Sequence, residues 1–243
     1  MKKILIVMTA LFVTVGALRA DWISKAKTLA TAQLEPLAGD LGGALGGGMY
    51  EPVKNGGLFG FDVGVRTSFA GISNETKTNI PAFKDSSYLA GVWLYASKGL
   101  PLGIDIFARY ASRKIESSNE SIDLTGFGVQ YTVISDKVIK PVPGVSLLAA
   151  VNNFSGPGLD AQTLSMAATV SKKLPIITPF ATLAIDKTGM EVASSIGTLK
   201  PKKTQSRVLA GIELRLIPFT YFNMAVSKSG SETGFQLGLG IKN

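Results

Sequence analysis

Seven charged side chains are the groups in this sequence best placed to do chemistry, because they recur at alternate positions among small and apolar residues. The chain has no histidine and no cysteine, which excludes Ser-His-Asp hydrolysis, attack by a thiolate and metal sites built on His or Cys. Catalysis would need paired carboxylates or a Ser-Lys pair, and no spacing singles one out. We therefore predict no enzymatic activity, no catalytic residue, no metal and no cofactor. The seven residues are Asp62, Arg66, Asp105, Arg109, Arg113, Glu213 and Arg215.

The segments that carry these charges alternate with a period of two. From 59 to 66, apolar residues are interleaved with Gly60, Asp62, Gly64 and Arg66. Such alternation is typical of β-strands with two different faces, and runs of about ten residues match tilted membrane strands. The pattern predicts ten strands, at 57–71, 87–97, 103–114, 122–134, 143–153, 161–173, 176–187, 205–216, 219–228 and 233–242.

The less apolar face of these strands distinguishes a membrane barrel from a soluble barrel or sandwich. A soluble fold would expose long charged residues there. This face instead carries mostly Gly, Ser, Thr and Ala, which fit a narrow lumen while the bulky apolar set meets lipid. The longest uncharged stretch after the N-terminus, 141–159, is broken by prolines and glycines and predicts no membrane helix. We predict an all-β fold, a transmembrane antiparallel up-and-down β-barrel of about ten strands, preceded by a short amphipathic helix.

The alternation would direct the seven charged side chains toward the lumen, with Arg113 near the outer rim. Charges of both signs in a confined space are costly unless they pair, so one interpretation is a salt-bridged packing network. The other interpretation is the polar lining of a passage or gate.

The N-terminus predicts export. Lys2 and Lys3 precede an apolar run of 15 residues from Ile4 to Leu18, which ends at a small residue, Ala20. This run is short for a membrane span and has the form of a cleaved signal peptide. We predict a signal peptide at 1–20, an amphipathic helix and Gly-rich linker at 21–56, the barrel at 57–243, and a location in the cell outer membrane.

The segment after the signal peptide has helical spacing. Its apolar stripe predicts an amphipathic helix over 22–35 that ends near Pro36, and the six glycines between 39 and 48 predict a flexible hinge. Such a stripe needs cover, so the helix is expected either inside the lumen as a plug or, as we favour, across the periplasmic mouth of the barrel. The stripe comprises Trp22, Ala26, Leu29, Gln33 and Leu37.

A basic stretch at 199–207 is predicted as an external loop. It holds four cations and no anion, Lys200, Lys202, Lys203 and Arg207. These cations are expected either to contact lipid phosphates of the outer leaflet or to form a solvated loop. Although the chain carries a formal charge of +8, basic and aromatic residues are not interleaved, so no nucleic acid partner is predicted.

Short Gly-rich motifs, in the same order along the chain, give a resemblance to a family. The sequence from Leu34 through Gly48-Met49-Tyr50, the run 100–103, the run 126–130, the run 170–175 and the last strand resemble an uncharacterised outer-membrane β-barrel family of diderm bacteria. The resemblance implies an exported barrel with an N-terminal helical segment, and it supplies no activity. Many outer-membrane barrels end in an aromatic residue that the barrel-insertion machinery recognises, whereas this chain ends in Ile241-Lys242-Asn243.

These observations favour a passive channel for small solutes, with a periplasmic helix closing its mouth. The alternative is a non-conducting structural or surface-interaction barrel, adhesin-like or in contact with lipopolysaccharide. Expected partners are outer-membrane lipids, including lipopolysaccharide, and the insertion machinery. The sequence specifies neither a solute nor an oligomeric state.

Overall fold

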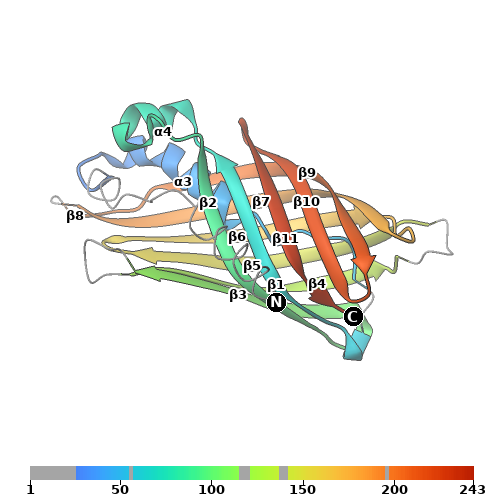
Figure 1. The fold of residues 1–243 in the computed structure, drawn as a ribbon. Coiled ribbons are helices and arrows are strands. Elements are labelled where there is room, and N and C mark those ends of the chain that lie inside the picture. The colour runs from blue at the N-terminus through green and yellow to red at the C-terminus, as the bar shows by residue number, and fades with distance from the viewer. Residues whose placement is uncertain (1–25, 55–56, 115–120, 137–141, 195–196) are drawn as a thin grey trace.

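The computed structural model describes residues 26–54, 57–114, 121–136, 142–194 and 197–243. The predicted signal peptide and Trp22 lie outside these residues. Ten long strands form one closed antiparallel barrel, in which each strand pairs with the next and β1 pairs with β11 (Figure 1). The strands are β1 Phe61–Gly71, β2 Tyr88–Gly99, β3 Ile104–Lys114, β4 Ser121–Ile134, β5 Gly144–Gly156, β6 Leu159–Ser171, β7 Ile177–Ser194, β9 Lys202–Ile217, β10 Thr220–Ser229 and β11 Glu232–Lys242. The predicted fold class and strand number are confirmed.

Period-two alternation produces the two faces of the wall. Along β6, buried and exposed residues alternate without interruption. Bulky apolar side chains point outward, as Met166 and Leu183 do at 61% and 64% exposure, while Thr163 and Ser165 point inward and are fully buried. A wall that exposes its large apolar residues and buries its small polar ones has the polarity of a membrane barrel and the reverse of a soluble one.

One connection differs from the prediction. The segment 188–204 was expected to be the longest loop, yet β7 continues to Ser194 and β9 begins at Lys202. The short strand β8, Gly197–Leu199, pairs back onto β7 in between. The inward positions Thr188, Met190 and Val192 are buried and pair with the first residues of β6. This pairing continues β7 beyond residue 187, where the predicted strand ends. The local sequence alone does not show this pairing.

The two ends of the barrel differ. At one end β1 joins β2, β3 joins β4, β5 joins β6, β7 joins β9 and β10 joins β11, and we call this the loop end. It carries the longest connection, which contains the helix α4 Asn74–Asn79 and the 3-10 turn η2 Pro81–Phe83 (Figure 1). At the opposite end, the turn end, the 3-10 turns η1 Gly57–Phe59 and η3 Pro101–Gly103 lie beside the start of β1 and the end of β11.

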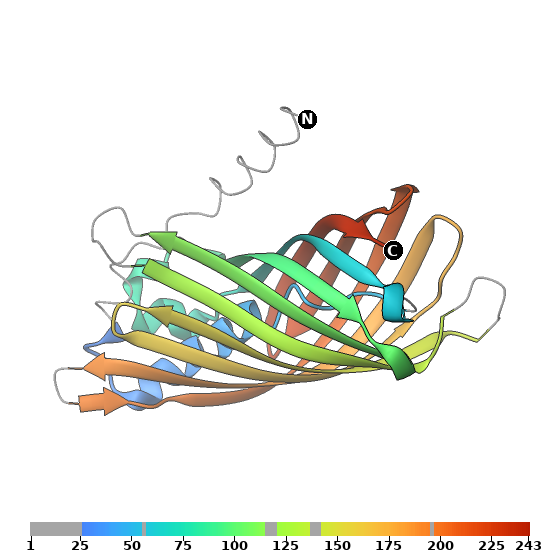
Figure 2. The ribbon, with the colours of Figure 1, turned by 90° about the horizontal axis from the view of Figure 1, so that it is seen from below.

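The N-terminal helix lies inside the barrel. This helix, α3 Thr31–Leu45, contacts β1, β2, β6, β7 and β9, and two views show it enclosed by the strands in the half nearer the loop end (Figures 1 and 2). The favoured position across the periplasmic mouth and the boundaries 22–35 are therefore wrong. Pro36 is inside α3, where proline costs about 3 kcal/mol. Burial of Leu34, Leu37 and Leu41 within the barrel offsets that cost. Among the described residues, no helix is both long enough and apolar enough to cross a bilayer.

The glycines that predicted a flexible hinge are close-packed. Most of them belong to α3 or the turn after it, and all from Gly39 to Gly48 are buried. A Cβ at Gly46 would lie 2.6 Å from Asp186 Oδ1 and 2.8 Å from Arg207 Nη2, and one at Gly47 would lie 2.6 Å from Ser68 Oγ. The absence of side chains lets the backbone approach the wall in a narrow lumen. The hinge interpretation is therefore wrong.

Replacing Gly46 with alanine is expected to destabilise the barrel by about 1–3 kcal/mol, because the new methyl group overlaps two buried charged side chains. Urea unfolding in micelles measures this change. Gly189→Ala is the matched control, since a Cβ there meets only Lys202 Cγ at 3.9 Å. Equal stability of both variants would show that the packing around Gly46 is loose.

Candidate functional site

The lumen is occupied along its length by residues 31–54, which we call the plug. At the loop end, Asn79 Nδ2 donates to the Gln33 carbonyl at 2.9 Å. In the middle of the lumen, the Gly48 N–H donates to the Gln236 side chain at 3.0 Å. Near the turn end, the Val53 N–H donates to Ser171 Oγ at 3.1 Å. The plug therefore passes from one end of the barrel to the other before the chain enters β1.

The C-terminus of α3 is held by side chains from the wall. The last carbonyls of a helix have no partner within it, and they carry the negative end of the helix dipole. Arg207 donates to the Gly43 and Gly42 carbonyls at 3.0 and 3.1 Å. Arg109 donates to the Leu45 carbonyl and to that of Gly47, the latter at 2.6 Å. Arginines on β9 and β3 thus satisfy buried carbonyls with positive charge, and we call these two residues the arginine clamp.

The two arginines of the clamp differ in their other partners. Arg207 forms an ion pair with Asp186 at 2.6 Å. Arg109 donates to Asn152 Oδ1 at 2.7 Å and stacks over Trp93, with its guanidinium carbon 4.4 Å from the ring centroid. Within the described residues no carboxylate pairs with Arg109. The salt-bridged network that the sequence suggested for the seven charges therefore does not include Arg109, whose partners are plug carbonyls and Asn152.

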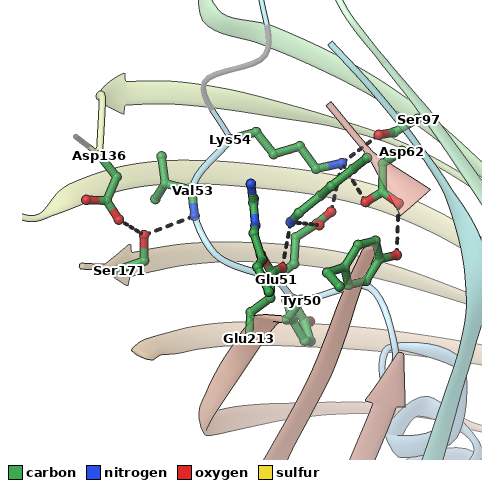
Figure 3. A network of polar contacts seen from close by, with 12 residues as sticks. Tyr50, Glu51, Val53, Lys54, Asp62, Ser97, Asp136, Ser171 and Glu213 are labelled. Atoms are coloured by element: carbon green, nitrogen blue, oxygen red, sulfur yellow. Dashed lines mark hydrogen bonds and ion pairs between the residues drawn. The ribbon is translucent and has the colours of Figure 1, made fainter. Parts of the chain in front are cut away.

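A second set of contacts joins the plug to the wall in the half nearer the turn end. Glu51 accepts from Arg66 Nη2 at 3.1 Å and pairs with Lys54 at 2.8 Å. Arg66 also pairs with Asp62 at 2.9 Å, and Lys54 reaches Ser97 Oγ at 2.5 Å (Figure 3). Five buried side chains and the partly buried Lys54 form this charge network, and their three carboxylates and three cations balance: Glu51, Asp62, Glu213, Lys54, Arg66 and Lys242.

Tyrosines enclose the centre of the charge network. Tyr95 donates to Glu51 at 2.9 Å and Tyr221 donates to Asp62 at 2.8 Å. The Arg66 guanidinium carbon lies 4.4 Å from the Tyr95 ring centroid and 5.1 Å from that of Tyr221. Buried ions are tolerated when they are both paired and hydrogen-bonded, and the carboxylates of Glu51 and Asp62 meet both conditions.

The structure buries five of the seven predicted lumen charges inside the barrel, namely Asp62, Arg66, Asp105, Arg109 and Glu213. Arg215 is partly exposed and pairs with Glu213 at 2.9 Å. Arg113 is exposed on β3 at the loop end. Glu51 and Lys54, which belong to the plug, are not among the charges predicted from the sequence. Their signal was a charged pair in a segment with no strand pattern, and local sequence does not show that this segment enters the lumen.

A small cavity of about 120 Å³ remains at the turn end. Asp105, Asp136, Lys173 and Arg215 are among its lining residues. Burial, together with the nearby positive charges of Arg215 and Lys242, lowers the pKa of Lys173, which lies in the turn outside the strands. In the part of the chain that the structure describes, no group of three or more His, Cys, Asp or Glu residues is placed to hold a metal ion.

The predicted basic loop divides into residues with different surroundings. Lys200 forms an exposed ion pair with Glu191 at 2.7 Å. Lys202 and Lys203 are exposed at the start of β9. Arg207 lies in the lumen as part of the arginine clamp, so its assignment to a lipid-phosphate loop is wrong. Because β9 begins at Lys202, Arg207 belongs to the strand, and the alternation of the wall directs its side chain into the lumen.

The predicted helix stripe is partly retained. Ala26 and Leu37 are buried, and Leu29 packs against the same apolar cluster. Gln33 is exposed, and its side chain accepts from the Ala30 N–H at the start of α3. The stripe therefore packs against the inner wall and the connections at the loop end rather than against lipid.

One family model matches most of the chain. The model of a family of unknown function (DUF6588) matches residues 81–242. A search of curated proteins finds no match to the sequence.

Three solved structures illustrate the similarity in fold. The N-terminal β-barrel domain of OprF from Pseudomonas aeruginosa is 14% identical, with 58% of this chain and 96% of that chain covered and a TM-score of 0.39. A loop-deletion mutant of OmpT, an outer membrane protein of Vibrio cholerae, is 10% identical, with coverage of 63% and 53% and a TM-score of 0.35. Ail, the attachment invasion locus protein of Yersinia pestis, is 12% identical, with coverage of 75% and 95% and a TM-score of 0.26. At these identities the similarity concerns the fold and assigns no activity.

Proposed function

Since the chain belongs to the DUF6588 family of unknown function, we propose its function from its own geometry. We propose that it is an outer-membrane β-barrel held closed by its plug, and that it serves as a structural or surface-interaction protein rather than as an open channel. The observation that carries the proposal is the continuous course of residues 31–54 through the lumen, fixed by hydrogen bonds near both ends and by the buried bonds of Arg207 between them. A passive channel would require this segment to leave the barrel.

The outward face of the wall supports the location. Exposed large apolar residues occur on every strand of the barrel, and a protein in water would not expose so many together. The strand number is even, so β1 begins and β11 ends at the same side of the membrane, which for outer-membrane barrels is the periplasm. The loop end then faces outward. Fractionation of cells should recover the protein with the outer membrane, and recovery as a soluble periplasmic protein would contradict this location.

The same geometry supports a protein without enzymatic activity. The buried carboxylates of the charge network are paired with cations, and Asp186 is paired with Arg207. A general acid or base needs access to substrate, whereas Glu51, Glu213 and Asp186 are buried and ion-paired.

Conductance in planar bilayers tests the closed barrel. The intact protein is expected to give no steady current, because the plug and the side chains that hold it fill the lumen. A variant that lacks residues 21–54 should fold into the same barrel and conduct, because removing the plug leaves the lumen without its filling. Heat-modifiable migration on gels checks that both proteins are folded. A steady current through the intact protein as large as that through the deletion variant would contradict the proposal and favour a channel.

A further inference from the structure

Three lysines gather on the outer face of the wall near the loop end. Lys187 on β7, Lys202 on β9 and Lys228 on β10 occupy exposed, outward-facing positions. In the register of the sheet, Lys187 lies opposite Thr204, two residues from Lys202, so these two lysines are diagonal neighbours about 7–8 Å apart. Lys228 lies opposite Val208 on the other side of β9. The three lysines therefore lie on β9 and on its two neighbouring strands, level with the first half of β9.

Two apolar grooves extend below these lysines on the outer face. One, of about 760 Å³, is lined by Ser206, Val208, Val226, Lys228, Tyr88 and Phe235, among others. Aromatic rings form its far wall, since Phe235 stacks on Phe69 with centroids 4.3 Å apart and meets Tyr88 edge-on at 5.5 Å.

The other groove, of about 690 Å³, lies on the β7 side and includes Leu183, Ile185 and Met166 in its lining. Ser206 and Val208 line both grooves, so β9 forms a ridge between them.

The lysines are not balanced by acids on the same strands. Among the described outward-facing residues of β7, β9 and β10, the carboxylate near the loop end is Glu191, and it is paired with Lys200. On the neighbouring side of the wall the sign of the charge changes, since Asp160 on β6 is exposed. A positive patch above apolar grooves is complementary to an amphiphile with an anionic head and acyl chains.

We propose that this surface binds a phosphorylated lipid of the outer leaflet that carries several acyl chains. Its phosphates pair with Lys187 and Lys202 on one side of the β9 ridge and with Lys228 on the other, while its chains occupy the two grooves. The inference rests on the proposed outer-membrane location, with the loop end facing outward. The lipid-phosphate contacts expected from the sequence involved the four cations of the stretch 199–207. Of these four, only Lys202 belongs to the site proposed here.

Native mass spectrometry of the full chain in neutral detergent tests the site. The probes are hexa-acylated lipid A with two phosphates, the same lipid with one phosphate, and phosphatidylglycerol. The wild-type protein should retain the two-phosphate lipid A most strongly. The variant K187S/K202S/K228S should lose about tenfold or more in affinity for it, because each phosphate contact is charge-assisted.

The matched control is K84S/K98S/K114S, which removes the same charge from exposed lysines away from β7, β9 and β10. Its affinity for lipid A should stay within about twofold of the wild type, a difference under 0.5 kcal/mol. Unchanged binding by the first variant, or equal retention of all three lipids, would overturn the proposal. A dimer that forms without lipid and is lost in the first variant would assign the surface to a second copy of the chain and overturn it as well. Since this binding is measured in detergent, its failure is separate from a failure of the conductance or fractionation tests.

Discussion

Replacing Arg66 with leucine is expected to lower the free energy of unfolding of the barrel by about 3–5 kcal/mol, because it removes a buried cation that pairs with two buried carboxylates. Arg66 Nη2 lies 2.9 Å from Asp62 and 3.1 Å from Glu51, and all three side chains are about 1% exposed. The substitution also removes the guanidinium from between Tyr95 and Tyr221. Urea unfolding in micelles, followed by heat-modifiable migration, gives the change.

The control for Arg66 is Arg113→Leu, which removes the same charge from an exposed position on β3 and should cost less than about 1 kcal/mol. The double variant Arg66→Leu, Glu51→Gln should recover part of the loss, since it removes one carboxylate together with one cation from the charge network. A cost of about 1 kcal/mol or less for Arg66→Leu would mean that water reaches the network and that these charges are hydrated rather than buried.

Replacing Arg207 with leucine is expected to cost about 3–5 kcal/mol and to loosen the plug. The change removes the ion-pair partner of Asp186, which is fully buried, and two hydrogen bonds to the Gly42 and Gly43 carbonyls at the end of α3. Limited proteolysis of the folded barrel should then cut the plug, which the wild type protects. Unfolding in urea measures the loss of stability.

Arg109→Leu provides the comparison for Arg207. Arg109 also holds plug carbonyls, but its partners are neutral, so its loss leaves polar groups unsatisfied without isolating a charge. We expect about 1–3 kcal/mol for this variant, less than for Arg207→Leu. The reverse order would show that the helix carbonyls, rather than the ion pair with Asp186, determine the strength of the arginine clamp.

The wall of the barrel could be predicted from the sequence because alternation is a local property. A residue such as Asp62 or Glu213 has its direction fixed by its immediate neighbours, and the structure buries both inside. The C-terminal end of β7 could not be predicted, since residues 188–192 join the strand only through their pairing with β6.

The plug could not be predicted because its packing depends on distant parts of the chain. Gly42, Gly43 and Gly46 are typical of a flexible linker when considered locally, yet each lies against wall residues more than a hundred positions away. The same holds for the ion pair of Glu51 with Lys242, which joins the plug to the last strand. The position of the helix within the lumen is fixed by these contacts together with the packing of its apolar residues against the wall.

Disulfide trapping of the plug against the wall tests the closed lumen most directly. A Cβ at Gly43 would lie 3.0 Å from the Ala70 Cβ, close enough for a disulfide after a small adjustment, and the chain has no native cysteine to interfere. In isolated outer membranes, the variant G43C/A70C should cross-link almost completely with a mild oxidant, and each single variant should stay reduced. Free thiols that both react with maleimide in a folded, heat-modifiable barrel would contradict a plug that occupies the lumen.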